Sequence, residues 1–123
     1  MPAGKRELAR IERRLITTLT EACETAKSEI NGFTWLTHTA DLTALAETLN
    51  VIWVFETLAD RKLAEVDAKA RIFALTAIAL DEAGIELKLT DRNVRFDSEQ
   101  ECENAQGGDW QKRLAKGRYN ATL

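Results

Sequence analysis

Apolar residues recur at helical spacing near the start of the chain. Steps of three and four residues separate Leu8, Ile11, Leu15, Leu19, Ala22, Ala26 and Ile30. This spacing is that of one face of a helix. Asn31 and Gly32 follow at once, and glycine tolerates the left-handed geometry that ends many helices. The pattern predicts a helix over residues 5–31.

Two runs rich in β-branched and aromatic residues come next, over residues 33–38 and 51–55. Such runs are typical of strands. Between them, residues 42–49 have helical spacing, with Asp41 as a suitable N-cap. Alternation places Phe33, Trp35, Trp53 and Phe55 on one face of the strands and Leu36, Ile52 and Val54 on the other. Both faces are apolar, so we expect the sheet to be covered on both sides.

A second helical stripe follows, and it ends before Gly84. Its members are Leu63, Val66, Ala70, Phe73, Ala77 and Leu80. Further apolar residues widen this stripe, so we expect this helix to be the most buried one. Alternation over residues 85–89 and 94–96, with turn residues at 90–93, then predicts a hairpin with one buried and one solvent-exposed face.

The resulting order, α-β-β-α-β-β, predicts one α+β domain over residues 1–123. We expect a four-stranded, mostly antiparallel sheet with the two long helices on one face. We expect the folded part to span about residues 5–114 and residues 115–123 to form a flexible tail. The predicted core includes Leu15, Leu19, Ala22, Trp35, Trp53, Phe55, Phe73, Ala77, Leu80, Leu87 and Phe96.

Composition supports an ordinary globular domain of 123 residues, with 45% hydrophobic and 30% charged residues. These values exclude a disordered chain, and 6 Gly with 1 Pro exclude a collagen-like one. The net charge of −3 lacks the basicity of a nucleic-acid coat protein. Two cysteines are too few for a secreted disulfide framework. With no signal peptide or membrane span in the pattern, we expect a cytoplasmic bacterial protein.

Residues suited to catalysis are scarce. The sequence pattern gives no sign that Cys23 or Cys102 lies beside the single histidine, His38, as a nucleophile beside its base. Cys23 borders an apolar helix face, and Cys102 lies among acids, which raise the pKa of a thiol. Metal-ligand spacing and phosphate-binding loops are absent from the sequence. We therefore predict no catalytic, cofactor or metal residues, and a protein that is not an enzyme.

Two charged segments are candidate sites. The basic one lies in the first half of the first helix and consists of Arg6, Arg10, Arg13 and Arg14. It suits phosphates, and hence nucleic acid, or an acidic protein surface. The acidic one consists of Asp97, Glu99, Glu101 and Glu103. Its register is not that of a calcium-binding loop, and a solvated acidic surface is the simpler interpretation. A small metal-assisted hydrolase using residues 97–103 is the enzymatic alternative.

Four stretches together resemble a known group of proteins: Gly32–His38, Val51–Thr57, Arg95–Cys102 and Gly107–Trp110. The chain resembles, over about residues 15–114, small bacterial proteins that are labelled "Fis family transcriptional regulator". The resemblance implies a regulatory role, and it brings no catalytic residues with it.

We therefore expect a non-catalytic binding or regulatory module. A protein partner is favoured, and nucleic acid binding through the basic helix is the alternative. The apolar face of Leu36, Ile52 and Val54 predicts self-association as a homodimer unless a helix covers it. Trp110 follows Gly107 and Gly108, and we expect it to fold back on the domain and bring Lys112 and Arg113 near the acidic segment.

Overall fold

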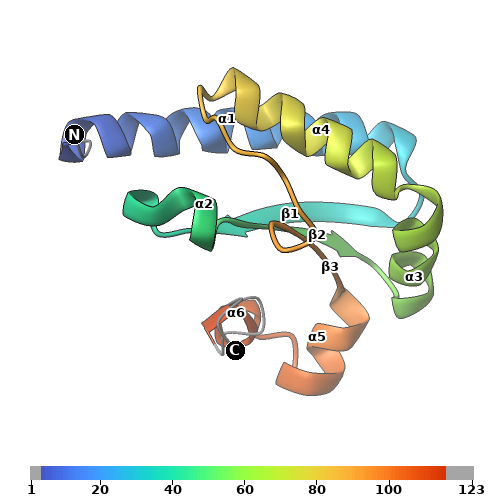
Figure 1. Cartoon of the computed structure of the whole chain (residues 1–123). Coiled ribbons are helices and arrows are strands. Elements are labelled where there is room, and N and C mark those ends of the chain that lie inside the picture. Colours follow the sequence, from blue (N-terminus) through green and yellow to red (C-terminus); the bar gives the residue numbers. More distant parts are fainter. Residues whose placement is uncertain (1–3, 116–123) are drawn as a thin grey trace.

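The structure, a computed structural model, describes residues 4–115 of the chain (Figure 1). Its elements are α1 (Lys5–Glu29), β1 (Phe33–Thr39), the 3-10 helix η1 (Leu42–Ala44), α2 (Leu45–Thr48), β2 (Asn50–Phe55), α3 (Leu58–Asp67), α4 (Lys69–Glu82), β3 (Val94–Ser98), α5 (Glu99–Gln106) and α6 (Trp110–Ala115). The predicted first helix, the first two strands and the short helix between them are confirmed. The predicted tail, beyond Ala115, lies outside the described residues.

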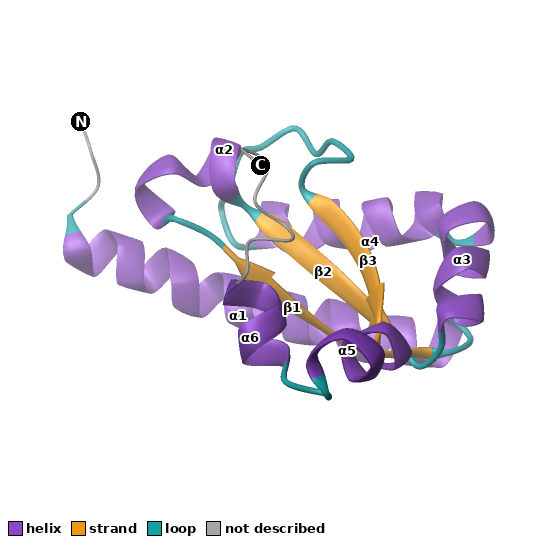
Figure 2. Cartoon of the chain, turned by 90° about the horizontal axis from the view of Figure 1, so that it is seen from below, coloured by secondary structure: helices purple, strands orange, loops and turns teal. Residues whose placement is uncertain are grey.

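The sheet has three strands in the order β1-β2-β3. Strand β2 is antiparallel to β1 and parallel to β3. Helices α1 and α4 lie on one face, which we call the upper face, and α5 and α6 lie on the opposite, lower face (Figures 1 and 2). The α+β class is confirmed, but the predicted four-stranded, mostly antiparallel sheet is wrong, because the described sheet is three-stranded and mixed.

The missing strand is the one expected over residues 85–89. Ile85, Leu87 and Leu89 do alternate, and they pack against the core of the upper face. The segment nevertheless forms no ladder, and the chain joins the sheet again only at β3, whose start Asn93 fixes beside β2. The Asn93 carbonyl accepts from Val51 N at 2.7 Å, and its side-chain amide donates to the Leu49 carbonyl at 2.9 Å. The connection from β2 to the parallel strand β3 is a crossover through α3 and α4, and residues 85–89 belong to its last part.

The second long helix is divided at Ala68, which ends α3 with φ −116° and ψ 4° and begins α4. The break changes which residues face the core. Those of α4 that are buried are Ile72, Leu75, Thr76, Ala79 and Leu80. The predicted stripe lies elsewhere: Leu63 and Val66 are 58% and 79% exposed, and Ala77 is exposed. The expectation that this stripe is buried is wrong for Leu63, Val66, Ala70 and Ala77, whereas Leu80 is buried and Phe73 half-buried.

A β-bulge in β1 changes the faces of the aromatic residues. The register shifts between Phe33, which pairs with Phe55, and Trp35, which pairs with Val54. Phe33 therefore packs in the upper core while Trp35 packs on the lower face, and Leu36 joins the upper core. Period-two alternation predicted the opposite for Trp35 and Leu36, since a bulge inserts one residue and reverses the faces.

The main core lies between the sheet and helices α1 and α4. Of the predicted core residues, Leu15, Leu19, Ala22, Trp53, Phe55 and Leu80 are buried, Trp35, Phe73, Leu87 and Phe96 are half-buried, and Ala77 is exposed. The lower face has a smaller core, in which Ile52 and Val54 pack against Trp35, Trp110 and Leu114. None of the helices within residues 4–115 combines the length and hydropathy needed to cross a membrane.

Candidate partner-binding surface

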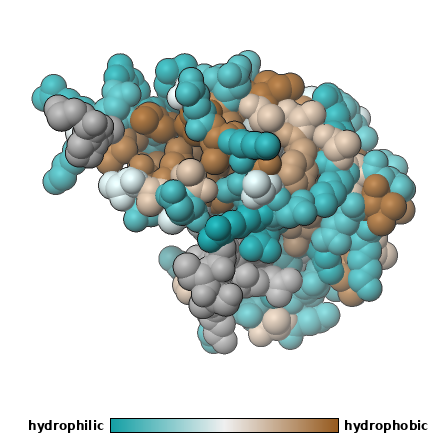
Figure 3. Space-filling model, viewed as in Figure 1, coloured by the Kyte–Doolittle hydropathy of each residue, from teal (hydrophilic) through white to brown (hydrophobic). Residues whose placement is uncertain are grey.

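The outward side of α3 and α4 carries an apolar surface, which we call the outer stripe. It consists of Leu63, Val66, Ala70, Phe73, Ala74, Ala77 and Ile78. All are exposed except Phe73, which is half-buried. Helix α4 is apolar on nearly every side, so burying its inner side against α1 and the sheet leaves apolar side chains outside. Figure 3 shows apolar atoms gathered over α4 between hydrophilic borders.

The stripe is also hollowed at the α3–α4 junction. Val66, Ala70 and Phe73 line a shallow groove there together with Lys69 and Asp91. Lys69 Nζ lies 3.0 Å from Asp91 Oδ1 and 5.8 Å from the centre of the Phe73 ring. Single exposed apolar residues are normal on proteins, but contiguous apolar surface rimmed by charges is typical of interaction sites.

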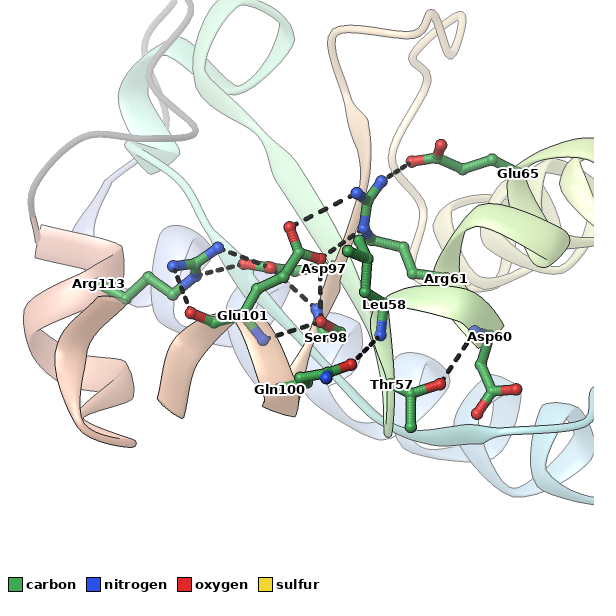
Figure 4. Close-up of polar contacts among 10 residues, drawn as sticks. All are labelled: Thr57, Leu58, Asp60, Arg61, Glu65, Asp97, Ser98, Gln100, Glu101 and Arg113. Atoms are coloured by element: carbon green, nitrogen blue, oxygen red, sulfur yellow. Dashed lines mark hydrogen bonds and ion pairs between the residues drawn. The ribbon is translucent and has the colours of Figure 1, made fainter. Parts of the chain in front are cut away.

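In the folded chain, the four acids of the acidic segment lie in different surroundings. Asp97, fully buried, forms a two-point ion pair with Arg113, which is 4% exposed (Figure 4). Arg113 Nε donates to Asp97 Oδ2 at 2.7 Å and Nη2 donates to Oδ1 at 2.8 Å. The bonds to Asp97 raise the pKa of Arg113, and its Nη1 also donates to Gln106 Oε1 at 2.7 Å. The pair therefore joins β3 to α6 by charge-assisted hydrogen bonds.

The other three acids have different surroundings. Glu99 accepts from the indole N–H groups of Trp35 and Trp110. Glu101 accepts from Arg61 Nε at 2.6 Å, which joins α5 to α3, and Glu103 is exposed. No group of three or more metal-ligating side chains occurs among residues 4–115. Since Asp97, Glu99 and Glu101 are held by arginine or indole groups, these contacts favour a structural role for the acidic segment.

The expected docking of Trp110 is confirmed. Its ring meets the Trp35 ring edge-to-face, with centroids 5.0 Å apart. Helix α6 thereby covers Ile52 and Val54, both fully buried. These two residues therefore offer no surface for self-association, and Leu36 faces the other side of the sheet. Arg113 reaches the acidic segment as expected, although the pair it forms is buried and not superficial.

The basic residues all lie on α1, whose N-terminal part projects beyond the sheet (Figures 1 and 2). Arg6, Arg10 and Arg13 line one shallow surface with Glu7, which pairs with Arg10. Arg14 instead turns to α4, where its Nη2 donates to the Glu82 carbonyl at 2.9 Å. The structure thus brings three of the four arginines onto one exposed face.

Of the two cysteines, only Cys23 lines a groove together with His38. This groove lies between α1 and β1, and burial lowers the pKa of the His38 imidazole. Cys102 is fully buried in α5, and burial raises the pKa of its thiol. A neutral, buried thiol is a poor nucleophile.

Sequence reasoning missed the outer stripe as a surface, although the residues were singled out. It placed the face of Leu63, Val66 and Ala77 inside the domain. The signal that would have revealed the error is that the apolar residues of 69–82 are spread over nearly every side of the helix, so that no single face is marked as the inner one.

Comparison with known proteins adds no further constraint. No family model matches the chain, and neither a curated protein nor a solved structure is found to be similar to it.

Proposed function

We propose that the protein is a non-catalytic binding module that takes a protein partner on the outer stripe. One observation carries the proposal: an apolar surface formed by Ala70, Ala74 and Ala77 with their neighbours stays exposed on a helix that is otherwise well packed. Burying such surface on association is favourable by ~25 cal/mol per Å². A regulatory role, which the resemblance of the sequence implies, is compatible with a module that acts by binding.

The proposal is tested by capture of partners from cells of the source organism, with and without nuclease. Ala74→Glu puts a charge in the middle of the stripe, and Ala105→Glu is the matched control because Ala105 is an exposed alanine of α5. We expect the wild-type chain and the control to retain a protein that Ala74→Glu loses, whether or not nuclease is added. Equal capture by the wild-type chain and both variants would contradict the proposal.

A second candidate is nucleic-acid binding by α1, favoured by the exposed row of Arg6, Arg10 and Arg13. With three phosphate contacts on a duplex, affinity would fall about 40-fold between 50 and 200 mM salt. Fluorescence anisotropy with labelled duplex DNA measures this slope. Binding that is unchanged in Arg6→Glu/Arg13→Glu would contradict this candidate.

A further inference from the structure

The charges at the two ends of α4 are arranged against the helix dipole. Lys69 and Arg71 lie in its first turn, and Asp81 and Glu82 lie in its last turn. Acids are favoured at the N-terminus of a helix and bases at the C-terminus. The helix dipole therefore does not stabilise these charges. A partner whose charges are ordered in the opposite direction would complement them.

The positions of the charges on α4 match such a partner. At 100° per residue, Arg71, Ile78 and Glu82 lie along one border of the outer stripe. A twofold axis perpendicular to both helices can pack a second α4 antiparallel against the first. The same border of the second helix then lies on the same side of the interface, but its residues run in the opposite direction. Arg71, whose guanidinium also pairs with Glu29 of its own α1, then faces Glu82 of the second copy, and Glu82 faces Arg71 of the second copy.

The middle of the stripe permits close approach. Ala70, Ala74 and Ala77 follow one another at steps of four and three residues, so they form a seam of small side chains along α4. Ile78 and Phe73 flank the seam on its two sides and supply apolar area. A seam of this kind is suited to an identical seam, because neither helix then meets a bulky side chain at the crossing point.

We propose that two copies of the chain associate through antiparallel pairing of their α4 helices along the outer stripe. This inference rests on the proposed function and names a second copy as the partner. The contact is self-complementary in charge, as a twofold interface requires. Because α4 is only about 21 Å long, the interface is small and the association is weak and dependent on concentration.

The first test is the molecular mass measured by sedimentation equilibrium from about 1 to 500 µM chain, where mass action makes association visible. We expect the mass to rise from one chain towards two, and Glu82→Arg to weaken association about tenfold by placing like charges together. The double variant Arg71→Glu/Glu82→Arg restores the opposite charges, so it should associate again. All chains in this comparison carry Glu29→Gln, because Arg71 otherwise pairs with Glu29 of its own chain. A single-chain mass throughout, or no recovery in the double variant, would overturn the proposal.

The antiparallel register of the two helices has a test of its own, which does not depend on whether the charge variants fold. With the axis passing between Arg71 and Glu82, the two Ala77 residues lie nearly opposite each other, whereas the two Ala70 residues lie about 20 Å apart. We expect Ala77→Cys to form an intermolecular disulfide under mild oxidation and Ala70→Cys to form none, since the bond needs Cα atoms within about 7 Å. Wild-type chain is the control for Cys23 and Cys102. Cross-linking by Ala70→Cys instead would overturn the antiparallel pairing.

The two proposals fail separately. If the chain is a monomer at every concentration while Ala74→Glu still loses a captured protein, the second copy is the wrong partner and the binding module stands. If the chain dimerises while capture is equal in all variants, only the contact between copies remains.

Discussion

The molecule has two apolar surfaces outside its main core, and they differ in whether another helix of the chain covers them. Ile52 and Val54 on the lower face of β2 are covered by α6 of the same chain. The outer stripe on α3 and α4 has no such cover within residues 4–115, and Val66 is 79% exposed. The difference lies in the polar anchors: α6 is held by Arg113 and by the Glu99 bridge between two indoles. An apolar face is closed when the chain also supplies directional contacts around it.

The largest expected effect comes from breaking the anchor of the lower face. Arg113→Met leaves the carboxylate of Asp97 buried without its arginine, which costs about 3–5 kcal/mol of unfolding free energy. Urea unfolding of the variant measures this cost. The matched control is Lys112→Met at the exposed neighbouring position, which should change stability by less than about 0.5 kcal/mol. Equal effects of the two substitutions would contradict a buried pair.

The next effect comes from removing the cover itself. Trp110→Ala deletes a half-buried ring that packs on Trp35, and we expect a loss of about 2 kcal/mol in unfolding free energy. Because Ile52 and Val54 become accessible, the variant should also bind more of a hydrophobic dye than the wild-type protein does. Unchanged thermal unfolding and dye binding would show that α6 does not close this face.

On the outer stripe, the expected effect on stability is much smaller. Val66→Ser removes apolar surface that is already in water, so the unfolding free energy should change by less than about 0.5 kcal/mol. Urea unfolding at low protein concentration checks this. A loss similar to that of Trp110→Ala would mean that Val66 is packed inside the domain, as the sequence pattern predicts.

The smallest effect concerns the border of the stripe. Arg71 donates two hydrogen bonds to Glu29 of α1, and these lower the pKa of Glu29 below its ordinary value of 4.5. The folded state therefore holds the ionised form more firmly than the unfolded state, and the pair stabilises the fold above pH 4.5. This contribution is lost as pH falls through the lowered pKa. The difference in melting temperature between wild type and Glu29→Gln should shrink from pH 7 to pH 3, and a constant difference would contradict the link.

The sequence predicts well where local chemistry decides the structure. The apolar steps from Leu8 to Ile30 give α1, Asp41 caps the short helix, and Ser98 caps α5 by accepting from Glu101 N at 3.1 Å. Each of these features depends on residues within a few positions of one another. The docking of Trp110 was also predictable, because a large aromatic side chain after two glycines gains by folding back.

Prediction fails where distant contacts decide. Alternation over residues 85–89 cannot show that Asn93 will hold β3 parallel to β2. A bulge at the start of β1 exchanges the faces of Trp35 and Leu36 without any change in the pattern. Among the candidate sites, the burial of Asp97 with Arg113 depends on α6 crossing the lower face, and the spacing of the charges gives no sign of it.

The most direct test of the account compares two alanines of α4 that differ only in the side they face. Ala79 is 2% exposed in the core, and Ala77 lies on the outer stripe. At concentrations where the chain is monomeric, we expect Ala79→Glu to lose several kcal/mol of unfolding free energy by burying a charge, and Ala77→Glu to change it by less than about 0.5 kcal/mol. Equal destabilisation by both substitutions would place Ala77 in the core and contradict the outer stripe as a binding surface.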